Sequence, residues 1–170
     1  MNMTRIATVI KAVACAVAAA CIAAIGMSTP AQAATYYSFK SGGSHGYCLY
    51  DDAGVNVIAA DLCGFGGSDI AWKWGAEENT WNGHTMRRLV SLDSGDCLTT
   101  DDLNFAEVYT APCGSHSGQF WTNDNQKLQN QNGNWLYYGN VTPDEFGRVV
   151  YSGDSLVNGT ANRTWTAILY

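Results

Sequence analysis

One phrase is written twice in this chain, and it constrains the fold more than any other feature. The sequence "CLYDDAGVNVIAADLC" at residues 48–63 returns 49 positions later as "CLTTDDLNFAEVYTAPC" at residues 97–113. Both copies open with Cys-Leu, continue with an Asp-Asp pair and an apolar run, and close on Cys. An internal repeat of this kind indicates an architecture assembled from copies of one small unit.

A tryptophan follows each copy, and a third version of the pattern follows the second. The first copy runs on to Trp74 and the second to Trp121, while the stretch from Asn134 to Trp165 keeps the same order without the cysteines. These tryptophans lie 47 and 44 positions apart, which predicts three repeats of about 45 residues. We expect each of the three tryptophans to be a core residue. The predicted repeats are about 36–86, 87–131 and 132–170.

Each predicted repeat has the right length for about four short strands. Runs rich in β-branched and aromatic residues are separated by clusters of Gly, Asn and Asp, as is typical of all-β proteins. Three units are fewer than the four to eight blades of a propeller, so the sequence predicts a closed threefold barrel. The predicted strands include "RRLVSL", "AEVYTA", "RVVYS" and "WTAILY".

The first 33 residues are predicted to be a secretory signal peptide. Arg5 and Lys11 precede an apolar run that leads to an Ala-Gln-Ala cleavage site ending at Ala33. The run is shorter than the roughly 20 residues that a membrane-spanning helix needs, so no membrane insertion is expected. A lipoprotein acylated at Cys21 is the alternative. Residues 34–170 are expected to form one secreted domain.

The charge balance narrows the choice of partners. Removing Arg5 and Lys11 with the signal peptide takes the formal net charge from −6 to −8. Proteins that bind nucleic acid or anionic membranes by charge need a basic surface that releases counterions. Neither is therefore an expected partner, and the acidic composition is better explained by solubility outside the cell.

Four cysteines remain after removal of the signal peptide, and an even number in an exported chain predicts disulfide bonds. Three pairings are possible. The repeated phrase favours Cys48 with Cys63 and Cys97 with Cys113, because each bond then closes one repeat on itself. A zinc site is the alternative, but it needs closer Cys pairs or His at set spacings. We expect no metal and no other cofactor.

The order Cys-Leu, then Val-x-x-x-x-Cys, then Gln-x-Trp, in three units after a signal peptide, resembles the β-trefoil of the ricin B-chain lectin family. Gln119-Phe120-Trp121 carries the Gln-x-Trp motif in full, while Trp72-Lys73-Trp74 and Arg163-Thr164-Trp165 keep only the tryptophan. The resemblance covers residues 36–170. It implies a β-trefoil that binds sugars in shallow pockets, up to one per repeat, without an obligatory metal.

The resemblance also implies where sugar-binding residues stand: an Asp two residues after the first Cys, an aromatic residue two before the second, and an Asn just before Gln-x-Trp. Carboxylates and amides hydrogen-bond sugar hydroxyls, and an aromatic face covers the apolar side of the ring. Most of these positions are occupied by other residue types. They hold Tyr50, Thr99 and Tyr137; Asp61, Ala111 and about Ser152; and Ala71, Gly118 and Asn162.

The third repeat offers the best combination for a sugar. It places Tyr137 and Tyr138 near Asn162, which alone matches the implied pattern. In the other repeats Asp51 and Asp101 lie one and two residues after the expected Asp position, and a small loop shift would bring either into a pocket. A turn is the simpler interpretation of those Asp-Asp pairs, because Asp favours turns.

No arrangement typical of an enzyme is found. The three histidines stand in Gly-rich loops, and neither Gly-x-Ser-x-Gly nor His-Glu-x-x-His is present, so we predict no catalytic residues. Two functions remain. The first is a secreted carbohydrate-binding module that binds a glycan or a cell-wall polysaccharide. The second is a protein-binding trefoil that acts as an inhibitor or as a subunit of a larger secreted complex.

Overall fold

The computed structural model describes residues 33–43, 46–52, 56–60, 63–101, 106–139, 148–154 and 163–170. They belong to a unit that runs from Ala33 to Tyr170. Residues 1–32, which hold most of the predicted signal peptide, lie outside the described ranges. In the part of the chain that is described, no helix is both long enough and apolar enough to cross a membrane.

All regular elements in these ranges are β-strands or short 3-10 helices, which confirms the all-β prediction. The strands are β1 (Tyr37–Ser41), β2 (Cys48–Asp52), β3 (Asn56–Ala60), β4 (Trp72–Trp81), β5 (His84–Ser91), β6 (Cys97–Thr100), β7 (Ala106–Ala111), β8 (Phe120–Thr122), β9 (Gln129–Asn130), β10 (Trp135–Tyr138), β11 (Arg148–Gly153) and β12 (Trp165–Leu169). The 3-10 helices are η1 (Ser68–Ile70), η2 (Ser117–Gln119) and η3 (Asp124–Gln126). The four runs predicted as strands lie in or overlap β5, β7, β11 and β12.

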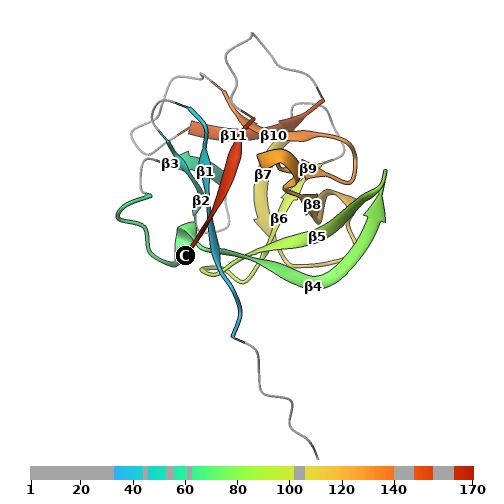
Figure 1. Ribbon diagram of the computed structural model, residues 1–170, viewed down its shortest axis with the longest axis horizontal. Helices are drawn as coiled ribbons and strands as arrows, with labels where there is room; N and C mark the ends of the chain where they lie inside the picture. Colours follow the sequence, from blue (N-terminus) through green and yellow to red (C-terminus); the bar gives the residue numbers. More distant parts are fainter. Residues whose placement is uncertain are drawn as a thin grey trace, which may run out of the picture. The chain divides into compact units, whose positions relative to one another are not determined.

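The described strands form one 12-stranded sheet with antiparallel pairing that curls around a central core (Figure 1). Strands β12, β1, β4, β5, β8 and β9 follow one another by direct pairing. The hairpins β2–β3, β6–β7 and β10–β11 form a second group of strands, in which β11 pairs with both β3 and β7. We call β1–β4 the first segment, β5–β8 the second and β9–β12 the third.

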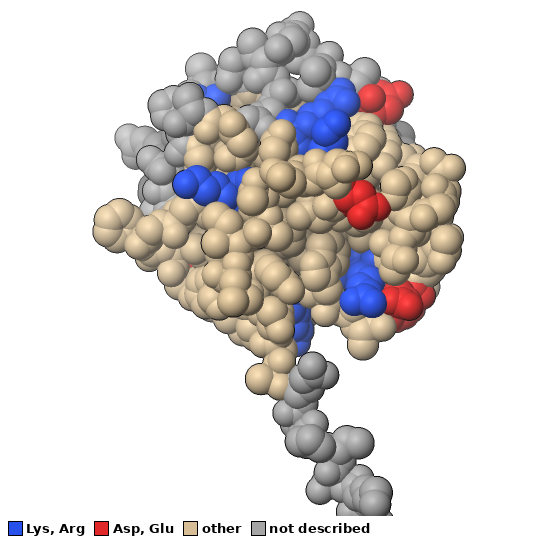
Figure 2. Space-filling model, in the orientation of Figure 1, with Lys and Arg blue, Asp and Glu red and all other residues tan. Residues whose placement is uncertain are grey.

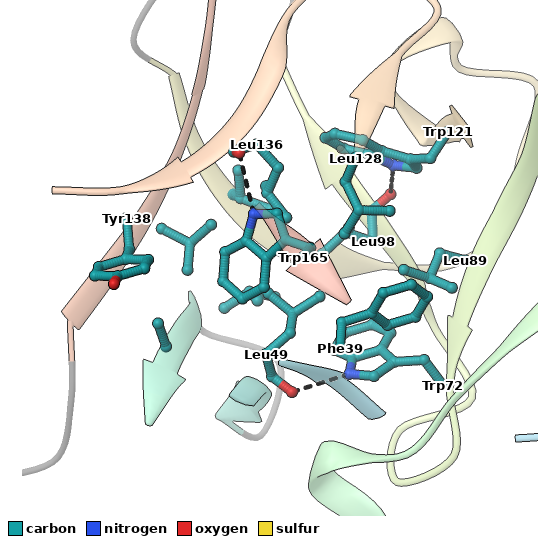
Figure 3. Packing of buried hydrophobic residues seen from close by; sticks show 14 residues of the cluster. Phe39, Leu49, Trp72, Leu89, Leu98, Trp121, Leu128, Leu136, Tyr138 and Trp165 are labelled. Carbon is teal, nitrogen blue, oxygen red and sulfur yellow. Dashed lines mark hydrogen bonds between the residues drawn. The ribbon is translucent and has the colours of Figure 1, made fainter. Parts of the chain in front are cut away.

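Three fully buried tryptophans organise the core: Trp72, Trp121 and Trp165. The indole Nε1 of each donates a hydrogen bond to the backbone carbonyl of a leucine in the second strand of its own segment (Figure 3). A buried indole N–H needs such an acceptor, so the same device holds all three segments to the core. The acceptors are Leu49, Leu98 and Leu136, at 3.1, 2.9 and 3.1 Å respectively.

The first of these tryptophans corrects the sequence analysis, which predicts Trp74 for this place. Trp72 is the core residue, whereas Trp74 is only half-buried and packs edge-on against Phe39, with ring centroids 5.9 Å apart. Residues i and i+2 of a strand point to the same face. Burial decreases along β4 as the strand leaves the core, so the second tryptophan on that face lies nearer the surface.

Both predicted disulfide bonds are present. Cys48 is bonded to Cys63 and Cys97 to Cys113, with Cα–Cα distances of 5.3 and 5.0 Å. Each bond ties the start of a hairpin to the loop that follows it, β2–β3 in the first segment and β6–β7 in the second. In the chain-entropy model a loop of this length stabilises the fold by about 3 kcal/mol.

Candidate functional site

The three buried tryptophans define which residues of the segments correspond. Trp72 precedes Trp121 by 49 residues, the same spacing as between the two Cys-Leu phrases. The position just before the Gln-x-Trp motif in the first segment is therefore Asp69 and not Ala71. The sequence analysis misses Asp69 because the tripeptide "WKW" offers two tryptophans; the 49-residue spacing is the signal that selects the first of them.

In the first segment, Asp69 lies beside Tyr50, the residue two positions after the first Cys. Tyr50 is on β2 and Asp69 is on η1, and both residues are half-buried. The pKa of Tyr50 is raised above its usual value first by burial, then by the negative charge of Asp69 and hydrogen bonding to it, and further by Asp52 and Asp93. Asp69 is thus the charged group that acts most strongly on the Tyr50 phenol.

One carboxylate oxygen of this pair has no partner within the described residues. Asp69 Oδ1 is buried and accepts no hydrogen bond from any of them, while the neighbouring Ser68 Oγ donates to Asp93 Oδ1 at 2.6 Å. Leaving a buried acceptor without a donor costs about 1–3 kcal/mol, so a ligand that supplies a hydroxyl is favoured there. The ring of Tyr50 adds an aromatic surface to the acceptor.

The corresponding place in the second segment is closed. A Cβ atom at Gly118, the residue before the motif, would lie 1.9 Å from the carbonyl oxygen of Thr100, so a larger residue does not fit. The amide of the buried Gln119 donates to Thr99 Oγ1 at 3.0 Å and to the Pro112 carbonyl at 3.1 Å. The polar atoms of the motif are therefore used to hold the loop after β7.

The third segment presents a pair of tyrosines. Tyr137 is 3% exposed and lies opposite Tyr151, with ring centroids 6.1 Å apart. Burial is the main cause that raises the pKa of Tyr137 to about 12; Tyr151 and Asp154 raise it further, and Arg163 lowers it. Tyr137 is thus a support for the half-buried Tyr151. Asn162, the predicted amide, lies outside the described residues.

Tyr138, the second aromatic residue predicted for this site, belongs to the core. Its side chain is 6% exposed and packs edge-on between aromatic neighbours. The ring centroids of Trp165 and Tyr47 lie 6.1 and 5.7 Å from that of Tyr138. Of the three tyrosines on β10 and β11, Tyr151 is therefore the one with an exposed part of its ring.

The two aspartates singled out in the sequence have partners within the protein. Asp51 is 1% exposed, and its carboxylate accepts hydrogen bonds from Thr110 Oγ1 at 2.9 Å and from Ser94 Oγ at 2.7 Å. It joins β2 to the second segment. Asp101 is exposed and accepts a hydrogen bond from the Tyr109 hydroxyl at 3.0 Å.

The two histidines within the described residues also have defined contacts. His116 Nδ1 accepts a hydrogen bond from the Gly118 N–H at 3.1 Å and caps η2. His84 Nδ1 lies 2.5 Å from Asp124 Oδ2, and His45 lies outside the described residues. In those ranges no group of three or more His, Cys, Asp or Glu residues is placed to hold a metal ion.

No family model and no curated protein matches this sequence, but solved structures share its fold. The designed three-fold symmetric protein ThreeFoil matches with a TM-score of 0.60 and 23% identity, covering 78% of this chain and 97% of its own. The β-trefoil lectin of the Vibrio vulnificus hemolysin/cytolysin, with N-acetyl-D-lactosamine bound, has a TM-score of 0.55 and 20% identity, covering 81% and 96%. The C-half of the earthworm R-type lectin, in complex with GalNAc, has 0.53 and 14%, covering 80% and 99%. The chain therefore has a β-trefoil fold.

Proposed function

We propose that this chain is a secreted, non-catalytic carbohydrate-binding protein of the lectin type, with a sugar site at Tyr50 and Asp69. The observation that carries the proposal is the buried Asp69 Oδ1, which lacks a donor among the described residues and lies in a carboxylate that interacts with a phenol. A pyranose supplies both complements, because its hydroxyls donate hydrogen bonds and its C–H face packs on an aromatic ring. The sugars bound in the Vibrio and earthworm lectins support the proposal.

The proposal includes the domain organisation that the repeats predict. Residues 1–33 direct export and are removed after Ala33, and residues 34–170 form a trefoil of three repeats with disulfide bonds inside the first two. The disulfide bonds support export, because such bonds persist in oxidising compartments. The threefold recurrence of the tryptophan-to-leucine hydrogen bond supports the repeat organisation.

A sugar site in the third segment, the segment that the sequence favours, stays a prediction. Tyr151 provides a half-exposed ring that Tyr137 supports from below, and Asp154 and Arg163 lie near the pair. Asn162 would supply the amide. If this site operates beside the first, Asn162→Ala lowers the number of sugars bound per chain while the affinity of the first site stays the same.

The test of the proposed function is binding of the oxidised protein, purified from a secreting host, to an array of glycans and microbial wall polysaccharides. We expect specific binding that free sugar competes. Asp69→Ala should weaken it about tenfold, since a hydrogen bond to a charged group is lost, and Tyr50→Phe should weaken it less.

Asp101→Ala is the matched control, because it removes an exposed carboxylate that follows β6, the counterpart of β2 in the second segment. Its binding should equal that of the wild type. An equal loss in Asp101→Ala contradicts the assignment to the first segment. A blank array from a correctly folded sample rejects carbohydrate binding.

A protein partner is the second candidate, and Phe65 favours it. This side chain is 92% exposed in the loop after Cys63, and aromatic residues are enriched in protein interfaces. A nucleic-acid partner is disfavoured by the acidic composition, and on the face in Figure 2 the acidic and basic side chains are interspersed. A partner recovered from the producer's culture medium by the wild type and lost with Phe65→Ser would support an inhibitor or a subunit of a secreted complex.

A further inference from the structure

We propose a second ligand site, for a neutral saccharide unit, in an open groove built from other elements than the Tyr50 and Asp69 pair. The groove lies where the β4–β5 hairpin meets β8 and η3, and its volume is about 420 Å³. That volume falls within the range of about 300–1,000 Å³ that is usual for small-molecule sites. The lining includes Trp74, Thr85, Arg87, Thr122, Asn123 and Asp124.

Strand alternation builds one wall of the groove. Met86 of β5 is fully buried, so its neighbours Thr85 and Arg87 point outward, because successive side chains of a strand face opposite sides. Trp74 of β4 completes this wall. It is half-buried and rests edge-on against Phe39, so it offers aromatic surface that is already held in place.

The hairpin that carries this wall is anchored to the rest of the molecule. Asn79 Nδ2 donates a hydrogen bond to Gln131 Oε1 at 2.8 Å. The guanidinium of Arg88 lies over the ring of Phe120, at 4.8 Å from its centroid, and forms an ion pair with Glu77. A wall that is fixed before binding lowers the entropy cost of holding a ligand.

The charges in the groove favour a neutral ligand over an anion. Arg87 is already engaged, since its Nε and Nη2 donate to Glu78 Oε2 at 3.0 and 2.6 Å. On the other wall Asp124 Oδ2 lies 2.5 Å from His84 Nδ1. The charges of Arg87 and Glu78 offset each other, and the carboxylate of Asp124 lies on the opposite wall. An anion would face the Asp124 carboxylate while the nearest guanidinium is bound to Glu78.

The polar atoms of the groove can accept hydrogen bonds from a ligand. Asn123 Oδ1 is buried and has no hydrogen-bond partner among the described residues, and its side chain does not cap η3. Asp124 adds a carboxylate beside it. Thr85 and Thr122 hydroxyls can donate or accept. A neutral pyranose fits this set, because its hydroxyls supply the donors and its C–H face packs on Trp74.

The test is a ¹⁵N NMR titration of the oxidised protein with three probes: N-acetylglucosamine, lactose and glucuronate. We expect at least one neutral probe to shift the indole N–H of Trp74 and the side-chain amide of Asn123 with one shared dissociation constant. Glucuronate should bind the groove about fivefold more weakly than that probe, because its carboxylate is repelled by Asp124.

Two variants and one control sharpen the test, with thermal unfolding verifying that each is folded. Asn123→Ala should weaken binding of the neutral probe at the groove about five- to tenfold, and Trp74→Phe about fivefold. Trp81→Phe, a half-buried tryptophan on the same hairpin, is the matched control and should stay within about twofold of wild type.

The outcomes separate this proposal from the first-segment site. Groove signals that still shift in Asp69→Ala establish that the two sites are independent. The groove proposal is overturned if neither neutral probe shifts Trp74 and Asn123, if glucuronate binds more tightly than both, or if Trp81→Phe weakens binding as much as Trp74→Phe. Each of these results stands whatever the glycan array reports for Asp69.

Discussion

The first and second segments share a scaffold and differ in the polar groups around it. In both, a disulfide bond closes the hairpin and a buried tryptophan donates its indole N–H to a leucine carbonyl. They differ just before the motif, where the first has Asp69 with an unpaired oxygen and the second has Gly118 against the Thr100 carbonyl. Core and polar surface depend on different residues, so the core pattern can repeat while the surface changes.

The next residue shows how each loop is held. Gln119 of the second segment uses its amide for three hydrogen bonds, including one that its Oε1 accepts from the Gly114 N–H at 2.8 Å. Ile70 stands at the same position in the first segment and is 3% exposed. A Cβ at Gly66 would lie 2.3 Å from Ile70 Cδ1, so apolar packing holds that loop. Under the proposed function, Tyr50 and Asp69 are then available to a ligand.

The largest expected effect tests the shared scaffold. Trp72→Ala and Trp121→Ala should each lower the free energy of unfolding by about 3–5 kcal/mol, because each opens a cavity in the core. Trp74→Ala is the matched control and should cost about 1–2 kcal/mol, since its ring is half-buried. Urea denaturation of the oxidised proteins measures all three. If Trp74→Ala costs as much as Trp72→Ala, the register that places Asp69 before the motif is wrong.

The second prediction concerns the position just before the motif, where the first and second segments differ. Gly118→Ala should lower the free energy of unfolding by about 2–3 kcal/mol, because its new Cβ meets a backbone oxygen that cannot move away alone. Asp69→Ala should leave it unchanged or raise it, because it removes a half-buried carboxylate with an oxygen that accepts no hydrogen bond from the described residues. Chemical denaturation of the two variants measures both changes in the free energy of unfolding. Equal costs would remove the distinction between a closed and an open position.

The third segment makes the stability of the protein depend on pH through Tyr137. The raised pKa of Tyr137, about 12 against a usual value near 10, means that the folded protein holds this proton more tightly than the unfolded chain. Its contribution to stability is complete below about pH 10 and is lost as the pH rises toward 12, by about 2 kcal/mol. The denaturation midpoint, measured between pH 9 and 12, should fall less steeply with rising pH in Tyr137→Phe than in the wild type. An identical slope in the variant would contradict the burial of this phenol.

The smallest expected effect concerns the charge within the candidate site. Asp69→Asn should lower the pKa of Tyr50 toward its usual value, because one of the charges that raises it is removed. Asp101→Asn is the matched control: it acts on Tyr109, whose pKa is raised by burial and by hydrogen bonding to Asp101. NMR titrations that resolve the ring signals of Tyr50 and Tyr109 follow each phenol separately. A Tyr50 titration that Asp69→Asn leaves in place would show that the two groups are not in contact.

Repetition made much of the fold predictable from the sequence. The strands "AEVYTA" and "RVVYS" and both disulfide pairs follow from local composition and from the doubled phrase, because each depends on residues close in the chain. The wrong choice of Trp74 arose because one tripeptide contains two tryptophans. Composition does not distinguish them, and only the 49-residue spacing selects the first.

The content of the candidate site was less predictable because it depends on distant contacts. Asp51 looks like a surface turn residue, but its partners Thr110 and Ser94 lie 59 and 43 positions away. The closure at Gly118 depends on the Thr100 carbonyl, which no side-chain pattern reveals. The sequence therefore indicates which positions of the segments correspond, whereas the contacts of each side chain depend on neighbours that are distant in the chain.

The most direct test of the account is isothermal titration of the oxidised protein with the strongest glycan from the array, for wild type, Asp69→Ala and Asp101→Ala. We predict that Asp69→Ala weakens the tightest class of sites about tenfold, while Asp101→Ala keeps the affinity and the stoichiometry of the wild type. Unchanged affinity in Asp69→Ala, or equal loss in Asp101→Ala, would contradict the claim that the first segment holds the sugar site and the second is closed.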